Sequence, residues 1–173
     1  MLEQLRARIV RQGPSLLRVP LKFTPFALQR QLLEQVLGWQ FRQALADGDL
    51  EFLESRWLKI EVRDLALHWF MTVENDKLVV SQHAEADVSF SGDANDLILI
   101  AARKQDPDTL FFQRRLQIEG DTELGLYVKN LMDAIELEAM PAPLRIGLLQ
   151  LAEFVEAGLQ EGTVQTSRVP LTC

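Results

Sequence analysis

The sequence predicts an α+β fold, and two features of its hydrophobic pattern indicate this. Apolar residues recur at helical spacing before Trp57 and after Gly92, whereas between them the spacing changes to every second residue. A further short strand, Leu116 to Glu119, stands between the later helices. Because four strands are grouped and helices lie at either end, the order indicates about five strands packed against helices rather than alternating β-α units.

The head of the chain is expected to be helical. Three apolar residues share one face of a short basic helix, namely Leu2, Leu5 and Ile9, and Gly13-Pro14 is expected to end that helix. A longer helix is predicted from Thr24-Pro25, a capping residue followed by proline at the first helical position. It runs to Asp47-Gly48-Asp49, and residues 50–56 are expected to add a short helix.

The strand region predicts an antiparallel meander with one covered face. Residues 58–62 alternate between apolar and charged, which is typical of a half-buried strand. Residues 65–72 are rather apolar on both faces, so this strand is expected inside the sheet. Glu74-Asn75-Asp76 turns the chain into a third strand near residues 78–81, and a fourth follows at residues 86–91.

The second half predicts three helices around the last strand. Gly92-Asp93 opens a helix that Asp106-Pro107 closes, and residues 110–112 (Leu-Phe-Phe) are expected to form an aromatic anchor. Gly120-Asp121 caps a strongly periodic helix, and two prolines then separate it from a last helix. The tail after Gly162 is expected to be irregular.

Composition favours an ordinary globular domain. Of 173 residues, 47% are apolar and 25% charged, so the chain needs no metal or disulfide to hold a core. The single cysteine, Cys173, suits a reducing compartment. No apolar run reaches the roughly 18 residues of a membrane span, and arginines interrupt any signal-peptide core near the N-terminus. A cytoplasmic protein is therefore expected.

Charge is unevenly distributed along the chain. The net charge is −7, which argues against nucleic acid as a partner, yet residues 1–31 alone carry +5 and the rest −12. Such a basic head is expected to bind a membrane surface reversibly, each basic residue near an anionic leaflet contributing about 1 kcal/mol. The alternative is a helix docked on the acidic surface of its own domain. The expected membrane contacts are Leu2, Leu5, Arg6, Arg8, Ile9, Arg11, Arg18 and Lys22.

The sequence contains no recognisable catalytic set. His68 and His83 show no metal-ligand spacing, and His68 is expected to be a packed, hydrogen-bonded residue of an apolar strand. There is no nucleophile elbow, phosphate loop or dinucleotide fingerprint. Most of the carboxylates are expected on solvated faces. We therefore expect no enzyme activity, no metal and no cofactor.

Large apolar side chains are more numerous than a thin sheet obviously needs. They could pack the core, or they could line a ligand cavity, which is also mostly apolar. The periodicity of the apolar residues does not distinguish core packing from a ligand cavity.

Three ordered motifs resemble sterol-carrier-protein domains. Residues 86–97 (ADVSFSGDANDL) are similar to the strand-to-helix passage of that family, residues 106–112 (DPDTLFF) follow, and residues 115–121 (RLQIEGD) resemble its closing strand and helix start. The resemblance covers about residues 45–138. It implies five mostly antiparallel strands with helices on one face, around an apolar tunnel for acyl, sterol or isoprenoid chains. The expected lining is Leu67, Trp69, Met71, Phe111, Phe112, Leu124, Val128, Leu131, Leu144 and Leu148.

The basic N-terminal extension and the C-terminal residues indicate a particular group within this family. The end Leu171-Thr172-Cys173 is not a peroxisomal address, and the chain is similar to bacterial accessory factors of oxygen-independent ubiquinone biosynthesis, in which a helical head precedes this domain. This implies an extension at 1–44, a lipid-binding domain at 45–162 and a tail at 163–173. It also implies a peripheral membrane protein that binds hydrophobic ubiquinone intermediates, with phospholipid as a further candidate, and presents them to ubiquinone-biosynthesis proteins.

Two other functions stay open. The first is a protein-interaction scaffold whose cavity is filled by its own side chains. The second is an enzyme, because related domains occur fused to acyltransferases, although no loop for acyl-CoA phosphates is present.

Overall fold

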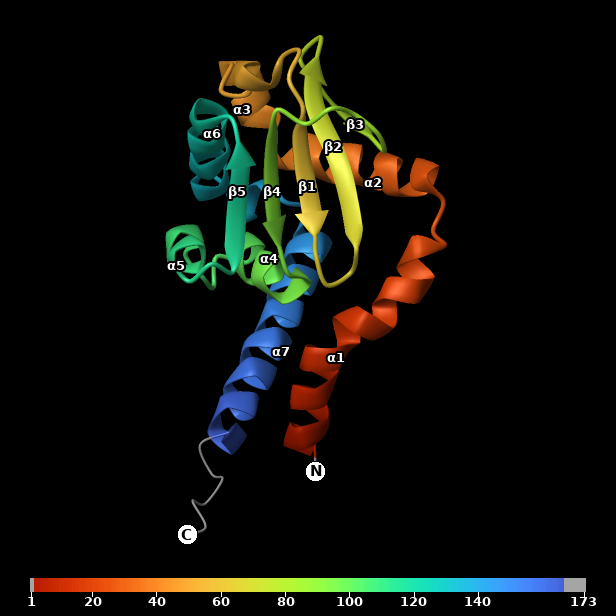
Figure 1. The fold of residues 1–173 in the computed structure, drawn as a ribbon, viewed down its shortest axis with the longest axis vertical. Helices are drawn as coiled ribbons and strands as arrows, with labels where there is room; N and C mark the ends of the chain where they lie inside the picture. The colour runs from red at the N-terminus through yellow and green to blue at the C-terminus, as the bar shows by residue number, and fades with distance from the viewer. Residues whose placement is uncertain (1, 167–173) are drawn as a thin grey trace.

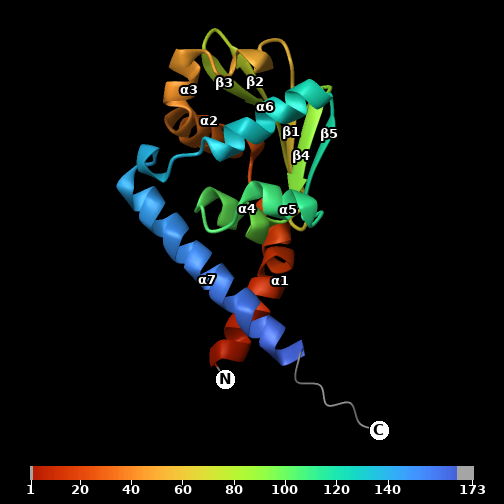
Figure 2. The ribbon, with the colours of Figure 1, turned by 90° about the vertical axis from the view of Figure 1, so that its left-hand side faces the viewer.

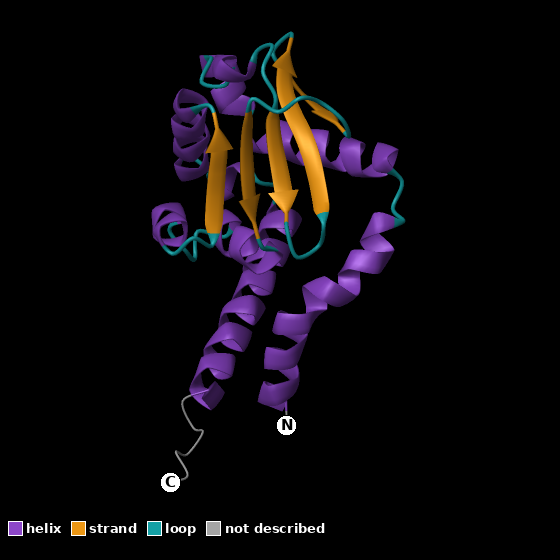
Figure 3. Cartoon of the chain, in the orientation of Figure 1, coloured by secondary structure: helices purple, strands orange, loops and turns teal. Residues whose placement is uncertain are grey.

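A five-stranded sheet with helices packed on one face forms the body of the molecule (Figures 1 and 2). The structure, a computed structural model, describes residues 2–166, with side chains for residues 4–160 except Leu17 and Lys22. Figure 3 shows strands and helices segregated as the sequence predicts, which confirms the α+β fold. The strands are β1 (Leu58–Val62), β2 (Leu67–Glu74), β3 (Lys77–Ser81), β4 (Val88–Gly92) and β5 (Leu116–Gly120).

The strand order is β3-β2-β1-β4-β5, and three of its four pairings are antiparallel. The first three strands form the predicted meander, but β4 does not continue it: β4 lies parallel to β1. Hydrogen bonds between Trp57 and Asp87 hold the beginnings of these strands together. The Asp87 N–H donates to the Trp57 carbonyl (2.9 Å), and the Trp57 N–H donates to Asp87 Oδ2 (2.8 Å). Strands that begin side by side must run in the same direction.

The two faces of the sheet differ in character. Leu58 and Ile60 pair with Met71 and Trp69 on the face that the helices cover, together with Phe90. The open face carries alternate, mostly polar positions of the same strands: Lys59, Glu61, His68, Ser89 and Ser91. His68 is exposed there with its ring edge-on to Phe70 (5.8 Å between centroids), so the expected packed position of His68 is wrong.

The remaining helices include α2 (Phe26–Gln40), α3 (Arg42–Asp47), α4 (Ala94–Ala101), α5 (Pro107–Phe112), α6 (Thr122–Asp133) and α7 (Ala142–Thr166), with the short 3₁₀ turns η1 (Glu51–Leu53) and η2 (Leu137–Ala139). The helix expected from Pro25 to Asp47 is broken at Phe41, whose side chain is buried in the core. The main core lies between the sheet and α2, α3 and α6, and contains Leu58, Met71, Phe90, Leu110, Leu124, Val128 and Leu131.

Helix α1 (Leu2–Lys22) runs through Pro14 and Pro20, so the predicted end at Gly13-Pro14 is wrong. Pro14 has no N–H for the Val10 carbonyl, four residues earlier, and the helix bends along its length (Figure 1). Asn95 of α4 donates its Nδ2 hydrogen to that carbonyl instead (2.9 Å). A partner distant in the sequence therefore compensates for the proline.

Helices α1 and α7 pack side by side and project from the sheet and its covering helices (Figures 1 and 2). Their contact forms a second apolar cluster with α4, built from Val10, Leu99, Ala102, Ala152 and Val155. Helix α7 extends to Thr166, four residues past the expected helix end, and residues 167–173 of the expected tail lie outside the described residues. Among the helices described, none combines the length and apolar character needed to cross a membrane.

Candidate functional site

An apolar groove of about 400 Å³ lies at the β5 edge of the sheet, between β5, α5 and α6. Most of its wall is carbon-rich, and the few charged groups belong to α5, α6 and the end of β5. An apolar groove with a small number of polar groups is the usual form of a small-ligand site. The lining residues are Phe90, Pro107, Asp108, Phe111, Phe112, Leu116, Ile118, Glu119, Gly120, Asp121, Thr122, Gly125, Leu126, Lys129 and Met132.

Helix α5 forms one wall of the groove. Asp106 caps it by accepting a hydrogen bond from the Thr109 N–H (2.9 Å), and Pro107 supplies the fixed φ of a first helical residue. Leu110 is completely buried and fixes the helix to the core. The aromatic residues expected to anchor this segment do not do so, because Leu110 takes that role and both phenylalanines face outward.

The rim of the groove exposes large apolar side chains. Phe112 is 82% exposed, Leu126 57% and Phe111 45%. Singly exposed apolar residues are common, but three of them gathered around an apolar groove mark a surface for a ligand, a partner or a lipid. The rim therefore extends the apolar surface of the groove outward.

The floor of the groove depends on a glycine inside a helix. Gly125 of α6 is buried against β5, and a Cβ atom there would lie 3.0 Å from Cγ2 of Ile118. A glycine in a helix interior costs roughly 1 kcal/mol relative to alanine, so its presence has a packing reason. Here the missing side chain lets α6 approach the sheet closely at Ile118.

An ion pair links the two helices at the groove. Lys129 Nζ of α6 lies 2.9 Å from Asp108 Oδ1 of α5, and both side chains are partly exposed. The hydrogen bond with Asp108 raises the pKa of the Lys129 ammonium, and the charges of Asp108, Asp133 and Asp106 act in the same direction, while loss of hydration opposes them. The pair fixes α5 relative to α6.

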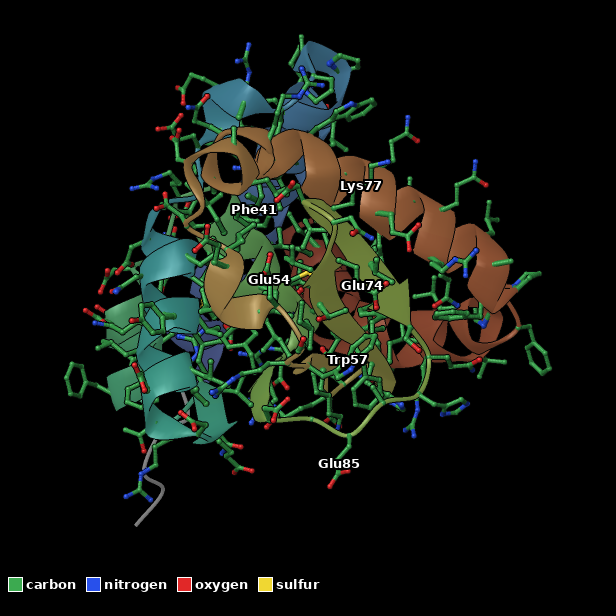
Figure 4. The ribbon with its side chains drawn as sticks, turned by 90° about the horizontal axis from the view of Figure 1, so that it is seen from above. Phe41, Glu54, Trp57, Glu74, Lys77 and Glu85 are labelled. Atoms are coloured by element: carbon green, nitrogen blue, oxygen red, sulfur yellow. The ribbon has the colours of Figure 1, made fainter. Side chains whose placement is uncertain are left out.

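A larger hollow of about 860 Å³ lies on the other side of α6, against α3 and η1. Asp49, Glu51, Glu54 and Glu123 line it, and the ring of Phe52 stacks on Tyr127 (5.1 Å between centroids). Figure 4 looks onto this end of the molecule and labels Glu54 and the core residue Phe41. Despite its size, this hollow suits an apolar chain less than the groove does, because carboxylates are costly to desolvate.

The ten residues expected to line one lipid cavity are spread over several places. Phe111 and Phe112 line the groove. Leu124 and Leu131 line the acidic hollow from the core, and Met71 and Val128 are buried in the core. The other four residues line neither the groove nor the acidic hollow. Leu67 and Trp69 are half-buried on the covered face of β2, where Trp69 Nε1 donates a hydrogen bond to Gln29 Oε1 (3.0 Å). Leu144 is exposed on α7, and Leu148 packs in the second cluster.

The structure adds groove residues that the expected lining omits. Phe90 and Ile118 were recognisable as inward-facing by strand alternation, but their partner across the groove was not. Gly125, Leu126 and Met132 come from the α6 face that turns toward β5. They lie on a different side of α6 from Leu124, Val128 and Leu131, which pack into the core.

The basic head docks by one face and exposes another. Ala7 and Val10 are buried, and Val10 packs against α7 and α4, whereas Leu5 and Ile9 are 55% and 47% exposed. Arg8, Arg11 and Arg18 are exposed, and Arg6 is partly buried. The side chains of Leu2 and Lys22, also expected at the membrane, lie outside the described residues. The segment thus docks through apolar contacts while its other face is exposed, and contact of that face with a membrane stays a prediction.

Comparison with known proteins identifies the family of this chain. The sequence profile described as "SCP-2 sterol transfer family" matches residues 33–133. Relatives named "Ubiquinone biosynthesis accessory factor UbiT", from Escherichia coli strain K12 and Escherichia coli O157:H7, are each 75% identical over 169 residues, covering 96% of this chain and 97% of the relative. A solved structure described as "UbiJ-SCP2 Ubiquinone synthesis protein" has a TM-score of 0.49 and 20% identity, covering 65% of this chain and all of its own. The chain therefore belongs to the SCP-2 sterol transfer family, and UbiT proteins are among its relatives.

Proposed function

We propose that this protein is a non-catalytic accessory factor of bacterial ubiquinone biosynthesis that holds a hydrophobic pathway intermediate in the groove between β5, α5 and α6. The observation that carries the proposal is an apolar groove with an exposed rim of Phe111, Phe112 and Leu126, in a chain 75% identical to a ubiquinone biosynthesis accessory factor. A non-catalytic role is supported by the relatives' name and by the few polar groups at the groove.

The proposal includes reversible attachment to the cytoplasmic membrane surface through α1. Leu5, Ile9, Leu16 and Val19 are exposed on this helix, and three exposed arginines accompany them. Apolar burial combined with attraction to anionic lipid gives peripheral, salt-sensitive binding. Lipid taken from the bilayer would then be presented to pathway proteins at the same surface.

Lipid carriage is tested by extracting the purified protein with organic solvent and analysing the extract by mass spectrometry. We expect quinone precursors, with or without phospholipid, and less of them from the double variant Phe111→Ser/Phe112→Ser. Both rings are exposed, so the fold should survive. Phe154→Ser, on the 38% exposed Phe154 of α7, is the matched control. A lipid-free extract from the wild-type protein would favour the scaffold instead.

Membrane attachment is tested by flotation with anionic vesicles. Ile9→Ser should reduce flotation, whereas Ile146→Ser should not, although these isoleucines are similarly exposed at 47% and 53%. Arg8→Gln/Arg11→Gln should weaken binding more than Arg42→Gln, and high salt should weaken it in the wild type. Equal flotation of all variants would remove α1 from the proposal but leave the groove.

A further inference from the structure

The groove is much shorter than the lipid it is proposed to serve. Its volume of about 400 Å³ holds about 13 non-hydrogen atoms if each takes the roughly 30 Å³ that a water molecule occupies in the liquid. That is about two or three isoprene units, or a ring with one such unit. A long isoprenoid chain exceeds this space several times over.

The groove is closed at its inner end by packed side chains. Gly125 lies close to Ile118, and the neighbouring core residues Leu124 and Val128 are each 3% exposed. Helix α6 separates the groove from the acidic hollow, and the two share no lining residue. A chain cannot extend inward without displacing the core.

The outer end of the groove is open and apolar. Phe112 and Leu126, which are 82% and 57% exposed, continue the apolar surface beyond the mouth of the groove. A chain leaving the groove meets these side chains first. Exposed apolar rims of this kind are typical of surfaces that contact lipid or a partner.

From these dimensions, and resting on the proposed function, we infer that the protein clamps only one end of a long lipid, about a dozen atoms, while the rest of the chain stays outside the groove. Ile118 and Gly125 set the depth of the clamp. The protein thus holds one end of the lipid and leaves most of its chain unenclosed.

The test is a chain-length series, with 4-alkylphenols of increasing chain length as probes and binding measured by displacement of a fluorescent apolar dye. Each methylene buried in the groove should tighten binding about fourfold. The gain should stop once ring and chain together reach about 13 non-hydrogen atoms. Ile118→Ala should move this plateau to longer chains and Gly125→Ala to shorter ones.

The matched control is Gly147→Ala, a helical glycine with no atom within 4 Å of an added Cβ, which should leave the plateau unchanged. Since Gly125→Ala could disturb packing, Ile118→Ala supplies an independent readout in the opposite direction. Affinity that keeps rising at the same slope through long chains would overturn the clamp while leaving the proposed function intact. Failure of every probe to bind would overturn both.

Discussion

Asn95 of α4 donates a hydrogen bond of 2.9 Å to the main-chain carbonyl of Val10 in α1, at the carbonyl that Pro14 leaves without its helical partner. The bond supplies the partner that the Val10 carbonyl lacks where α1 passes through Pro14. It also ties the basic head of the chain to the domain that contains the groove.

The Asn95–Val10 bond should stabilise the docked position of α1. Asn95→Ala leaves the carbonyl unsatisfied and should lower the free energy of unfolding by about 1–2 kcal/mol. Hydrogen exchange across residues 2–22 should also become faster. Restoring the N–H with Pro14→Ala should make Asn95→Ala less costly, which a double-mutant cycle measures. Asn130→Ala, at an exposed position, is the control; additive effects in the cycle would contradict this explanation.

Gly158 permits the close crossing of α1 and α7. A Cβ at this position would lie 2.5 Å from Val10 Cγ2, so Gly158→Ala should destabilise the protein by about 1–3 kcal/mol. Gly147→Ala on the same helix has open space and should stabilise it by up to about 1 kcal/mol. Chemical denaturation compares the two variants.

A smaller side chain at Val10 tests whether crowding against this residue causes the loss of stability. Val10→Ala combined with Gly158→Ala should recover part of the loss, because the colliding methyl group is absent. A loss of the same size in both backgrounds would show that crowding against Val10 is not the cause.

Arg115 neutralises a buried carboxylate. Asp96, in the first turn of α4, is 5% exposed, and Arg115 donates to both of its oxygens. Arg115→Met should leave that charge uncompensated and cost about 2–3 kcal/mol in urea denaturation. Arg114→Met, at the exposed neighbouring position, should cost far less. Adding Asp96→Asn to Arg115→Met should restore part of the loss; no recovery would refute the charge argument.

Lys129 and Asp108 should stabilise the groove in a pH-dependent way. The pKa of Lys129 is raised in the folded protein, first by its hydrogen bond with Asp108, so the ion pair contributes stability below the unfolded pKa of lysine. That contribution should disappear as pH rises through the higher folded pKa. The stability difference between wild type and Lys129→Met should therefore be constant near neutral pH and shrink in alkali.

The cause is tested separately by titrating Lys129 by NMR in wild type and in Asp108→Asn. Removal of the carboxylate should lower the pKa of Lys129. An unchanged titration would mean that Asp108 does not hold the ammonium.

Local spacing in the sequence determined much of this protein. The alternation in β1 and β4 correctly indicated which side chains face the helices, and Asp93 and Asp121 marked helix starts. These features depend on residues a few positions apart, so the sequence expresses them directly. The ordered motifs identified the family, which in turn indicated five strands beside an apolar space.

Tertiary contacts decided the rest, because they join residues far apart in the chain. Asp87 and Trp57 join the beginnings of β4 and β1, and Asn95 supplies the partner of the Val10 carbonyl that Pro14 leaves free in α1. The groove itself arises where Gly125 lets α6 approach Ile118, and no periodicity could indicate which face of α6 would turn there. Leu124 and Leu126 are both apolar and two residues apart, yet one closes the core and the other stands at the rim, because only the packing of α6 against β5 distinguishes them.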